Sequence, residues 1–142
     1  MSRVEIVADN ERSRKLADLV VDFFFEVLAA DAAGKVDDFL SAGFVDHDPA
    51  QGTIVGRAGV VAKLKALWTA FPDGRFELLE VIAAGDRVAA RSVFTGMQNG
   101  AFGAITPTGK TVRVTFSDWY RIEGGLICEH WQNFDDAGFH RQ

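Results

Sequence analysis

The sequence predicts an α+β fold, because two helical patterns in its first half are followed by a series of strand patterns. From Asn10 to about Ala30 apolar residues recur every three or four positions, and a second helical pattern runs from Gly56 to Phe71. After Gly74 the spacing of apolar residues changes to that of strands. Helices followed by a run of antiparallel strands are typical of α+β proteins.

Four strands are expected in the second half of the chain, and we predict them over 75–84, 87–97, 111–122 and 126–134. The last two are joined by Gly124 and Gly125, which adopt the positive φ angles of a tight hairpin turn without strain. Between the long helices, a short helix over 36–40 precedes the segment Phe44-Val-Asp-His-Asp-Pro49. In that segment His47 lies between two aspartates, and we interpret it either as a cavity residue or as a surface loop residue.

Composition and charge limit the class of protein. The 142 residues suffice for one domain, expected over residues 1–142, and 48% hydrophobic residues are typical of a globular chain. A net charge of −5 without a basic stripe argues against nucleic-acid binding. The N-terminus lacks the apolar region of a secretory signal, and no apolar run approaches the ~20 residues of a membrane span. The single cysteine, Cys128, excludes a disulfide within the chain, and a cytoplasmic location is expected.

The register of the last hairpin decides which of its side chains meet. In a tight two-residue loop Trp119 lies opposite His130. In a three-residue loop with a bulge at Gly125, Asp118 lies opposite His130 instead. A shift by one residue exchanges the two faces of a strand, and we prefer the bulged register.

The bulged register gathers a candidate acid–base site, because it places Asp118, His130 and Gln132 on one face. The same face then carries Phe116, Tyr120 and Cys128, and the opposite face carries Trp119, Ile127 and Trp131. A carboxylate beside an imidazole on a half-apolar surface is suited to proton transfer. The alternative is that these polar residues are exposed or form a structural hydrogen bond.

Two residues outside the hairpin are candidate ligand contacts. Trp68 belongs to the aromatic stripe of the second long helix, and that spacing is more typical of a core position. Arg91 faces the side of its strand opposite to Val88 and Phe94. We interpret it either as the buried partner of a carboxylate or as a solvated charge.

Several common site patterns are absent from the sequence. It contains no GxGxxG or P-loop pattern for nucleotides, no HExxH pattern for a metal and no GxSxG pattern for a nucleophile. Any chemistry is therefore expected to be proton transfer without a cofactor or a metal.

Eight short segments in a fixed order carry a family resemblance. They are Phe44-Val-Asp-His47, Phe71-Pro-Asp73, Gly85-Asp-Arg-Val-Ala-Ala-Arg91, Phe102-Gly103, Pro107-Thr-Gly-Lys110, Arg121-Ile-Glu-Gly-Gly-Leu-Ile127, Glu129-His-Trp131 and Arg141-Gln142. By their order and spacing the chain resembles the SnoaL-like polyketide cyclase family of the nuclear transport factor 2-like superfamily. The resemblance implies a cone-shaped fold, in which a curved antiparallel sheet wraps a long N-terminal helix and leaves an apolar cavity. It also implies a homodimer through the outer face of the sheet, with Trp119, Ile127 and Trp131 as candidate contacts.

The same resemblance implies a reaction. Cyclases of this family close a ring by intramolecular aldol condensation of a polyketide ester, with an aspartate as general acid–base and without a metal or cofactor. The position of that aspartate, two residues after the histidine of Glu-His-Trp, holds Gln132 here, and a second polar site position matches Asp118. The resemblance therefore implies a cyclase, isomerase or lyase that acts on a small apolar carbonyl compound. Asp118 would be the base, His130 would orient it or share its proton, Gln132 would hold a carbonyl or oxyanion, and His47 or Asp48 would line the cavity.

Two other functions remain open from the sequence. Because glutamine cannot take up a proton, a non-catalytic module that binds a small molecule is the alternative. A third interpretation is hydrolysis of a strained ring by Asp118 and Arg91, which requires both side chains in one cavity.

Overall fold

The computed structural model describes residues 4–49, 52–101 and 108–134. Its elements in chain order are β1 (Glu5–Ala8), α1 (Glu11–Phe23), the wider turn η1 (Phe24–Leu28), the short helix η2 (Ala33–Asp38), β2 (Leu40–Asp48), β3 (Gly52–Val55), α2 (Ala58–Ala70), β4 (Arg75–Ala84), β5 (Arg87–Met97), β6 (Thr111–Glu123) and β7 (Leu126–Phe134). The α+β order is confirmed, and the four predicted strands agree with β4 to β7 within one residue. The strands β1 and β3 were not predicted. The resemblance segments at 102–103 and 141–142 and the start of the one at 107–110 lie outside the described residues.

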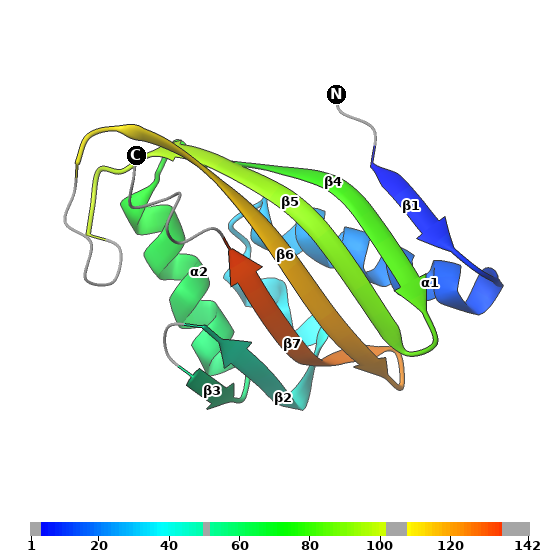
Figure 1. Cartoon of the computed structure of the whole chain (residues 1–142). Helices are drawn as coiled ribbons and strands as arrows, with labels where there is room; N and C mark the ends of the chain where they lie inside the picture. Colours follow the sequence, from blue (N-terminus) through cyan, green and yellow to red (C-terminus); the bar gives the residue numbers. More distant parts are fainter. Residues whose placement is uncertain (1–3, 50–51, 102–107, 135–142) are drawn as a thin grey trace.

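The seven strands form one curved sheet in the order β1-β4-β5-β6-β7-β2-β3 (Figure 1). Strands β4 to β7 form an antiparallel meander, as predicted. The two flanking additions are different, because β1 pairs with β4 and β2 pairs with β7 in parallel. The second of these parallel pairs brings the early part of the chain beside the last strand, and the candidate site lies there.

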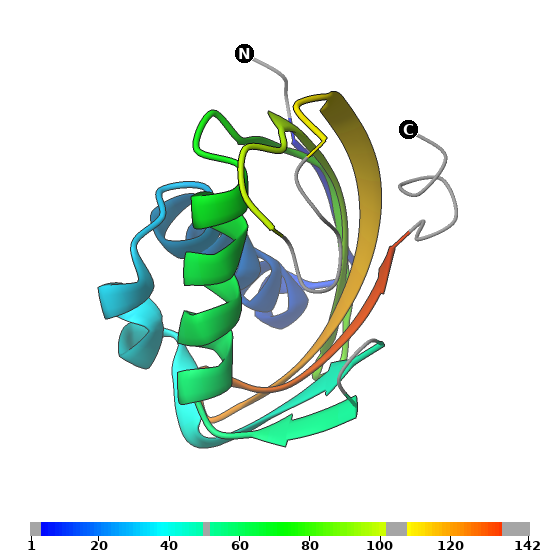
Figure 2. The ribbon, with the colours of Figure 1, turned by 90° about the vertical axis from the view of Figure 1, so that its left-hand side faces the viewer.

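Both long helices lie on the concave side of the sheet, which Figure 2 shows nearly edge-on. Helix α1 begins at Asn10, whose side chain accepts a hydrogen bond from the backbone N–H of Ser13 at 2.8 Å. Its buried residues Val20 and Phe23 pack against inward side chains of the sheet, including Tyr120. Burial of these apolar side chains is the main contribution to holding helix and sheet together.

The hairpin between β6 and β7 differs from the preferred register. Its loop is the two-residue turn Gly124–Gly125, with φ angles of 61° and 77°, and the extra residue lies within β7 near Cys128. Asp118 therefore pairs with Gln132 and not with His130. One extra residue reverses which face of β7 each later side chain occupies, whether it is inserted in the loop or in the strand. The predicted common face of Asp118, His130 and Gln132 is therefore confirmed.

The bulge also corrects the predicted placement of Ile127. Ile127 precedes the irregularity, pairs with Ile122 and is 0% exposed in the core, so it does not lie on the outer face. Cys128 is half-buried, and its Sγ–H donates to the backbone oxygen of Arg121 at 3.3 Å. Trp119 and Trp131 pair with each other, and Trp119 is exposed on the outer face as predicted.

Candidate active site

A buried imidazole lies between two carboxylates on the concave face of the sheet. Nδ1 of His130 is 2.9 Å from Oδ1 of Asp46, and Nε2 is 2.7 Å from Oδ1 of Asp118. The three residues are 9%, 2% and 8% exposed, respectively. Hydrogen bonds between charged groups in such a poorly solvated place are shorter and stronger than neutral ones.

Three neighbouring strands place this chain of side chains. Strand β7 lies between β6 and β2, and the parallel pairing of β2 with β7 puts Asp46 beside His130. On the other side His130 pairs with Tyr120, and Asp118 lies two residues earlier on β6 and so on the same face. The backbone ladder thus fixes both carboxylates relative to the ring.

Helix α2 adds a second cation to the site. Nζ of Lys63 is 3.0 Å from Oδ2 of Asp46 and 2.7 Å from Oδ2 of Asp48. Asp48 follows Asp46 on the same face of β2 and is also buried. The ammonium group therefore balances two carboxylates that would otherwise be costly to bury.

The contacts decide the charges of these groups. Burial alone lowers the pKa of His130, but the hydrogen bonds and charges of Asp118 and Asp46 outweigh it and raise the pKa to about 9. Burial raises the pKa of Asp46, yet His130 and Lys63 together lower it below its ordinary value. Burial lowers the pKa of Lys63, and its contacts with Asp48 and Asp46 raise it above the ordinary value. At neutral pH the ring is therefore an imidazolium that donates from both nitrogens.

Gln132 completes the polar set around Asp118. Its Nε2 donates to Oδ1 of Asp118 at 3.1 Å, the same oxygen that His130 contacts. In the part of the chain that the structure describes, the side-chain hydrogen bonds of Asp118 end on Oδ1. Among the described residues, neither the second carboxylate oxygen of Asp118 nor the other N–H of Gln132 has a hydrogen-bond partner.

Two aromatic side chains of β6, Tyr120 and Phe116, share the face of Asp118, as the sequence predicts. Tyr120 is buried and stacks on His130, with ring centroids 4.8 Å apart. Burial, with Asp118 and Asp46 nearby, raises the pKa of Tyr120 well above its ordinary value, so the phenol stays neutral. Phe116 contacts the ring of Phe134 at a centroid distance of 5.7 Å and is half-buried.

Trp68 makes the contacts of a core residue. Its indole N–H donates to the backbone oxygen of Leu28 at 3.2 Å, and its ring meets Phe76 and Phe94 edge-on. These contacts agree with the core position that its helical spacing favours. They connect α2 to the end of the N-terminal helical segment and do not involve the charged cluster.

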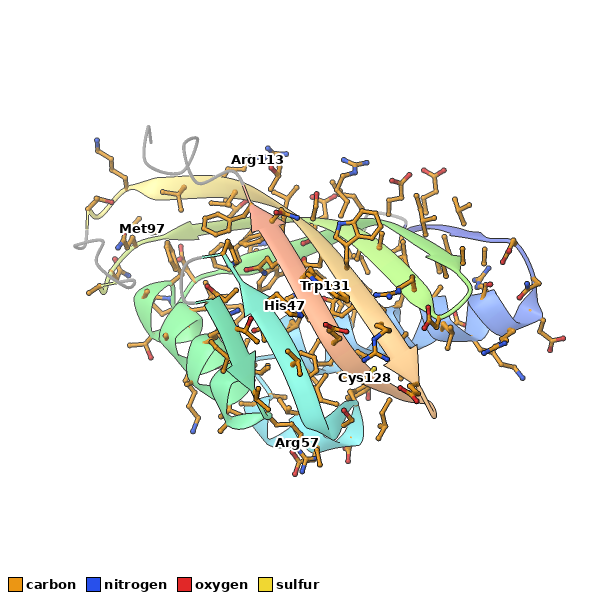
Figure 3. The ribbon with its side chains drawn as sticks, turned by 60° about the horizontal axis from the view of Figure 1, so that its bottom comes forward. His47, Arg57, Met97, Arg113, Cys128 and Trp131 are labelled. Carbon is orange, nitrogen blue, oxygen red and sulfur yellow. The ribbon has the colours of Figure 1, made fainter. Side chains whose placement is uncertain are left out.

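The structure places His47 outside the site. It points to the outer face of β2, where its Nε2 is 2.6 Å from Oε2 of Glu129 and its ring stacks on Trp131 at 5.1 Å. Figure 3 shows His47 and Trp131 side by side on the face turned away from the helices. His47 therefore lies on the outer surface, on a strand and not in the predicted loop, and it does not face the concave side where His130 lies. Alternation along β2 is the reason, because Asp46 and Asp48 occupy the inward positions.

Arg91 also lies on the outer face. It is paired with Glu80, with Nε and Oε1 3.8 Å apart, and its side chain is 56% exposed. Its neighbour Ala90 faces inward and pairs with Asp118, so Arg91 and Asp118 lie on opposite faces of the sheet. Arg91 is thus a solvated charge, and the opposite orientation of the two side chains argues against hydrolysis of a strained ring by this pair.

The sequence analysis missed two members of the cluster, Asp46 and Lys63, and considered Asp48 only as an alternative to His47. A signal for the aspartates exists, because Phe44 is buried and the residues two and four positions later share its face. No local signal marks Lys63. It reaches the site only because α2 lies over the concave side of β2.

The structure has two surface hollows. One, of about 540 Å³, lies at the turn between β6 and β7 beside Arg12 and Asp86. The other, of about 90 Å³, has Arg91, Trp119 and Asp118 in its lining. Neither is lined by His130, so the predicted apolar cavity at the site stays a prediction. Among the described residues no group of His, Cys, Asp or Glu is arranged to hold a metal ion, and no helix is long and apolar enough to cross a membrane.

Comparisons with known proteins agree with this fold. A family model described as SnoaL-like polyketide cyclase matches residues 18–142. The chain belongs to this family. No curated protein sequence is significantly similar to it.

Solved structures of similar proteins share the architecture. A candidate SnoaL-like polyketide cyclase from Jannaschia sp. CCS1 superposes with a TM-score of 0.82 at 21% identity, over 89% of this chain and 90% of that chain. A candidate polyketide cyclase from Acidithiobacillus ferrooxidans gives 0.76 at 26% identity, over 90% and 93%. AclR from Streptomyces galilaeus, a candidate hydroxylase, gives 0.75 at 25% identity, over 89% and 92%. The curved sheet around an N-terminal helix is thus the nuclear transport factor 2-like fold of SnoaL-like proteins. The names of these proteins refer to different reactions, cyclisation and hydroxylation, so the fold alone does not indicate which reaction a member catalyses.

Proposed function

We propose that this SnoaL-like protein is a cytoplasmic, cofactor-independent enzyme that acts on a small, largely apolar carbonyl compound of polyketide type by general acid–base chemistry. The observation that carries the proposal is the setting of Asp118. Its Oδ1 receives hydrogen bonds from the His130 imidazolium and from Gln132, at 2.7 and 3.1 Å, and the residue is largely buried. A fixed carboxylate in a site poor in water is suited to take a proton from carbon.

In the proposed reaction Asp118 removes a proton from the carbon next to a carbonyl group. The C–H bond breaks, its electron pair forms the enolate, and the proton remains on Asp118. The free N–H of Gln132 donates to the enolate oxygen, where negative charge develops. In a ring closure the enolate carbon attacks a second carbonyl of the same molecule, and Asp118 returns the proton to the resulting alkoxide. The reaction consumes no oxidant and releases no further group.

In this proposal the base lies on a different strand from the aspartate that the family resemblance implies. The family aspartate that the resemblance places on β7 is Gln132 here, and its amide contacts Asp118 on β6. The amide and the carboxylate pair directly across the two strands. The acceptor of the proton is therefore proposed on β6, with the glutamine as its hydrogen-bond donor.

Hydrogen–deuterium exchange tests the function without knowledge of the natural product. The protein is incubated in D2O and EDTA with a panel of aromatic β-keto esters and diketones, and loss of the α-proton signal is followed by NMR. Exchange faster than in buffer alone supports the proposal. If ligands of the panel bind but none exchanges faster than in buffer, the proposal is wrong and the protein is a binding module.

The binding-module alternative is favoured by one observation, the amide of Gln132 in place of a carboxylate. Gln132→Asp separates the two functions. If Asp118 is the base, the change removes the N–H donor and is expected to lower exchange by about 100-fold. A gain of exchange by the variant over an inactive wild type would favour the binding module instead. Asn133→Asp, the same change at the exposed neighbouring residue, is the control and is expected to leave exchange unaltered.

We also propose that the protein forms a homodimer through the outer face of the sheet. The strand registers align an apolar row from β1 to β7, namely Val7, Ile82, Ala89, Trp119 and Trp131. Trp119 is 50% exposed, which is unusual for so large an apolar side chain in a monomer. Ile127 is withdrawn from the contact because it is buried in the core.

Trp119→Lys is expected to convert the dimer into a monomer, because it places a charge in the middle of the apolar row. Light scattering coupled to size-exclusion chromatography measures the mass. Phe25→Lys, at an exposed aromatic residue outside the sheet, is the control and should retain the wild-type mass. A wild-type protein that is monomeric at high micromolar concentration contradicts the proposal.

A further inference from the structure

The imidazolium of His130 is held from two sides, and only one of them is the proposed base. We propose that Asp46 is a positioning residue of the site: fixed by Lys63, it holds Nδ1 of His130 so that the opposite N–H points at Asp118. The catalytic meaning of this inference rests on the proposed function. The orientation that it claims is measurable without any turnover.

Each oxygen of Asp46 has its own partner. Oδ1 contacts Nδ1 of His130 at 2.9 Å, and Oδ2 contacts Nζ of Lys63 at 3.0 Å. The residue is 2% exposed, so water has little access to replace either partner. Rotation of the carboxylate would break a charged hydrogen bond at each end, which fixes its plane.

The ring of His130 is enclosed on its edges and on one face. Asp46 on β2 takes one nitrogen, Asp118 on β6 takes the other, and Tyr120 stacks on the ring. Because both nitrogens are engaged, a ring flip would cost two hydrogen bonds. Asp46 therefore selects the orientation in which Nε2–H meets the proposed base.

The charged groups around the ring explain why Asp46 also sets its protonation. Asp118 and Asp46 face the nitrogens directly, Lys63 lies behind Asp46, and the neutral phenol ring of Tyr120 covers one face. Burial opposes the charge of the ring, and the two carboxylates overcome this opposition. With one carboxylate removed, the pKa of His130 falls and the population of the neutral imidazole rises. It carries a single N–H, so the donation to Asp118 is no longer assured.

NMR titration of the His130 ring tests the inference, with Asp46→Asn as the main variant. The asparagine keeps the size of the side chain and removes its charge. We expect the pKa of His130 to fall by about 1 unit or more. Asp48→Asn is the matched control, since it removes a buried aspartate of the same strand that shares Lys63. It is expected to change the pKa of His130 by less than half as much.

The pH dependence of deuterium exchange gives the catalytic readout. In the wild type, exchange is expected to fall at alkaline pH as His130 loses its proton near pH 9. In Asp46→Asn this limb should move to lower pH by the shift that NMR measures. A merely structural defect would lower exchange at all pH values and leave the limb in place, and that result would overturn the positioning role.

Two further outcomes keep the inference separate from folding and from the proposed function. If Asp46→Asn does not fold, the wild type decides: at pH 7 the 15N spectrum should show protons on both ring nitrogens of His130, and a single protonated nitrogen contradicts the inference. His130→Gln identifies these signals by their loss. If the wild type exchanges no compound, the proposed function fails, and the titration still decides whether Asp46 positions the ring.

Discussion

Asp118→Asn is expected to lower the rate of deuterium exchange by about 100-fold to 10,000-fold, the contribution of a general base. The asparagine keeps the size of the side chain, but an amide cannot take up a proton. The effect should appear in kcat with little change in KM, because the variant keeps the shape of the site.

A matched control separates this effect from the loss of any carboxylate. Asp86→Asn makes the same change in the turn between β4 and β5, where the side chain is 52% exposed and paired with Arg87. It should leave exchange within twofold of the wild type, and circular dichroism should show both variants folded. Retention of exchange by Asp118→Asn would place the base elsewhere, and Asp48 is then the carboxylate to examine.

Lys63→Met is expected to lower the free energy of unfolding by about 3 kcal/mol, because it removes the cation that contacts the buried carboxylates of Asp46 and Asp48. This is the low end of the usual range, since the Lys63 side chain is 26% exposed and some water can reach the carboxylates. Methionine replaces the aliphatic part of the side chain, so the loss reports mainly on charge. Urea unfolding at pH 7 measures it.

The control for this change is Lys65→Met, at an exposed lysine on the same helix, which is expected to be neutral within about 0.5 kcal/mol. Two conditions should diminish the effect of Lys63→Met. One is the addition of Asp48→Asn, which removes one of the two carboxylates that Lys63 contacts. The other is acid: the lowered pKa of Asp46 stabilises the fold above its ordinary pKa, and this contribution is lost as the pH falls through the lowered pKa, so the difference between the two proteins should become smaller toward pH 3. Equal losses at pH 3 and pH 7 would show that packing, and not charge, is responsible.

The common face of the polar hairpin residues was predictable from local pattern, in spite of an error in the register of the hairpin. The sequence analysis placed the extra residue at Gly125, and the structure has it near Cys128. Either position leaves Asp118, His130 and Gln132 on one face, because the face depends only on whether the shift is odd or even. The same irregularity moved Ile127 into the core, since residues before the bulge follow the alternation of the turn.

The second half of the site was not predictable in this way. His130 and Asp46 are 84 positions apart, and the sequence offers no local feature that makes β2 the neighbour of β7. Without that pairing His47 and the two aspartates beside it are equivalent candidates. With it, the burial of Phe44 on β2 assigns Asp46 and Asp48 to the concave face and His47 to the outer one.

The sequence by itself determined the two long helices, the bounds of the four strands β4 to β7 and the common face of three polar residues on the hairpin. These follow from periodicity and turn chemistry, which act over a few residues. Only the tertiary structure decided that His130 has a second carboxylate partner, that Lys63 closes the cluster, and that Arg91 lies on the opposite face from Asp118. Those contacts depend on which strands pair and which helix covers them. That choice is made by burial of apolar surface across the whole chain, because no short segment can bury its apolar face alone.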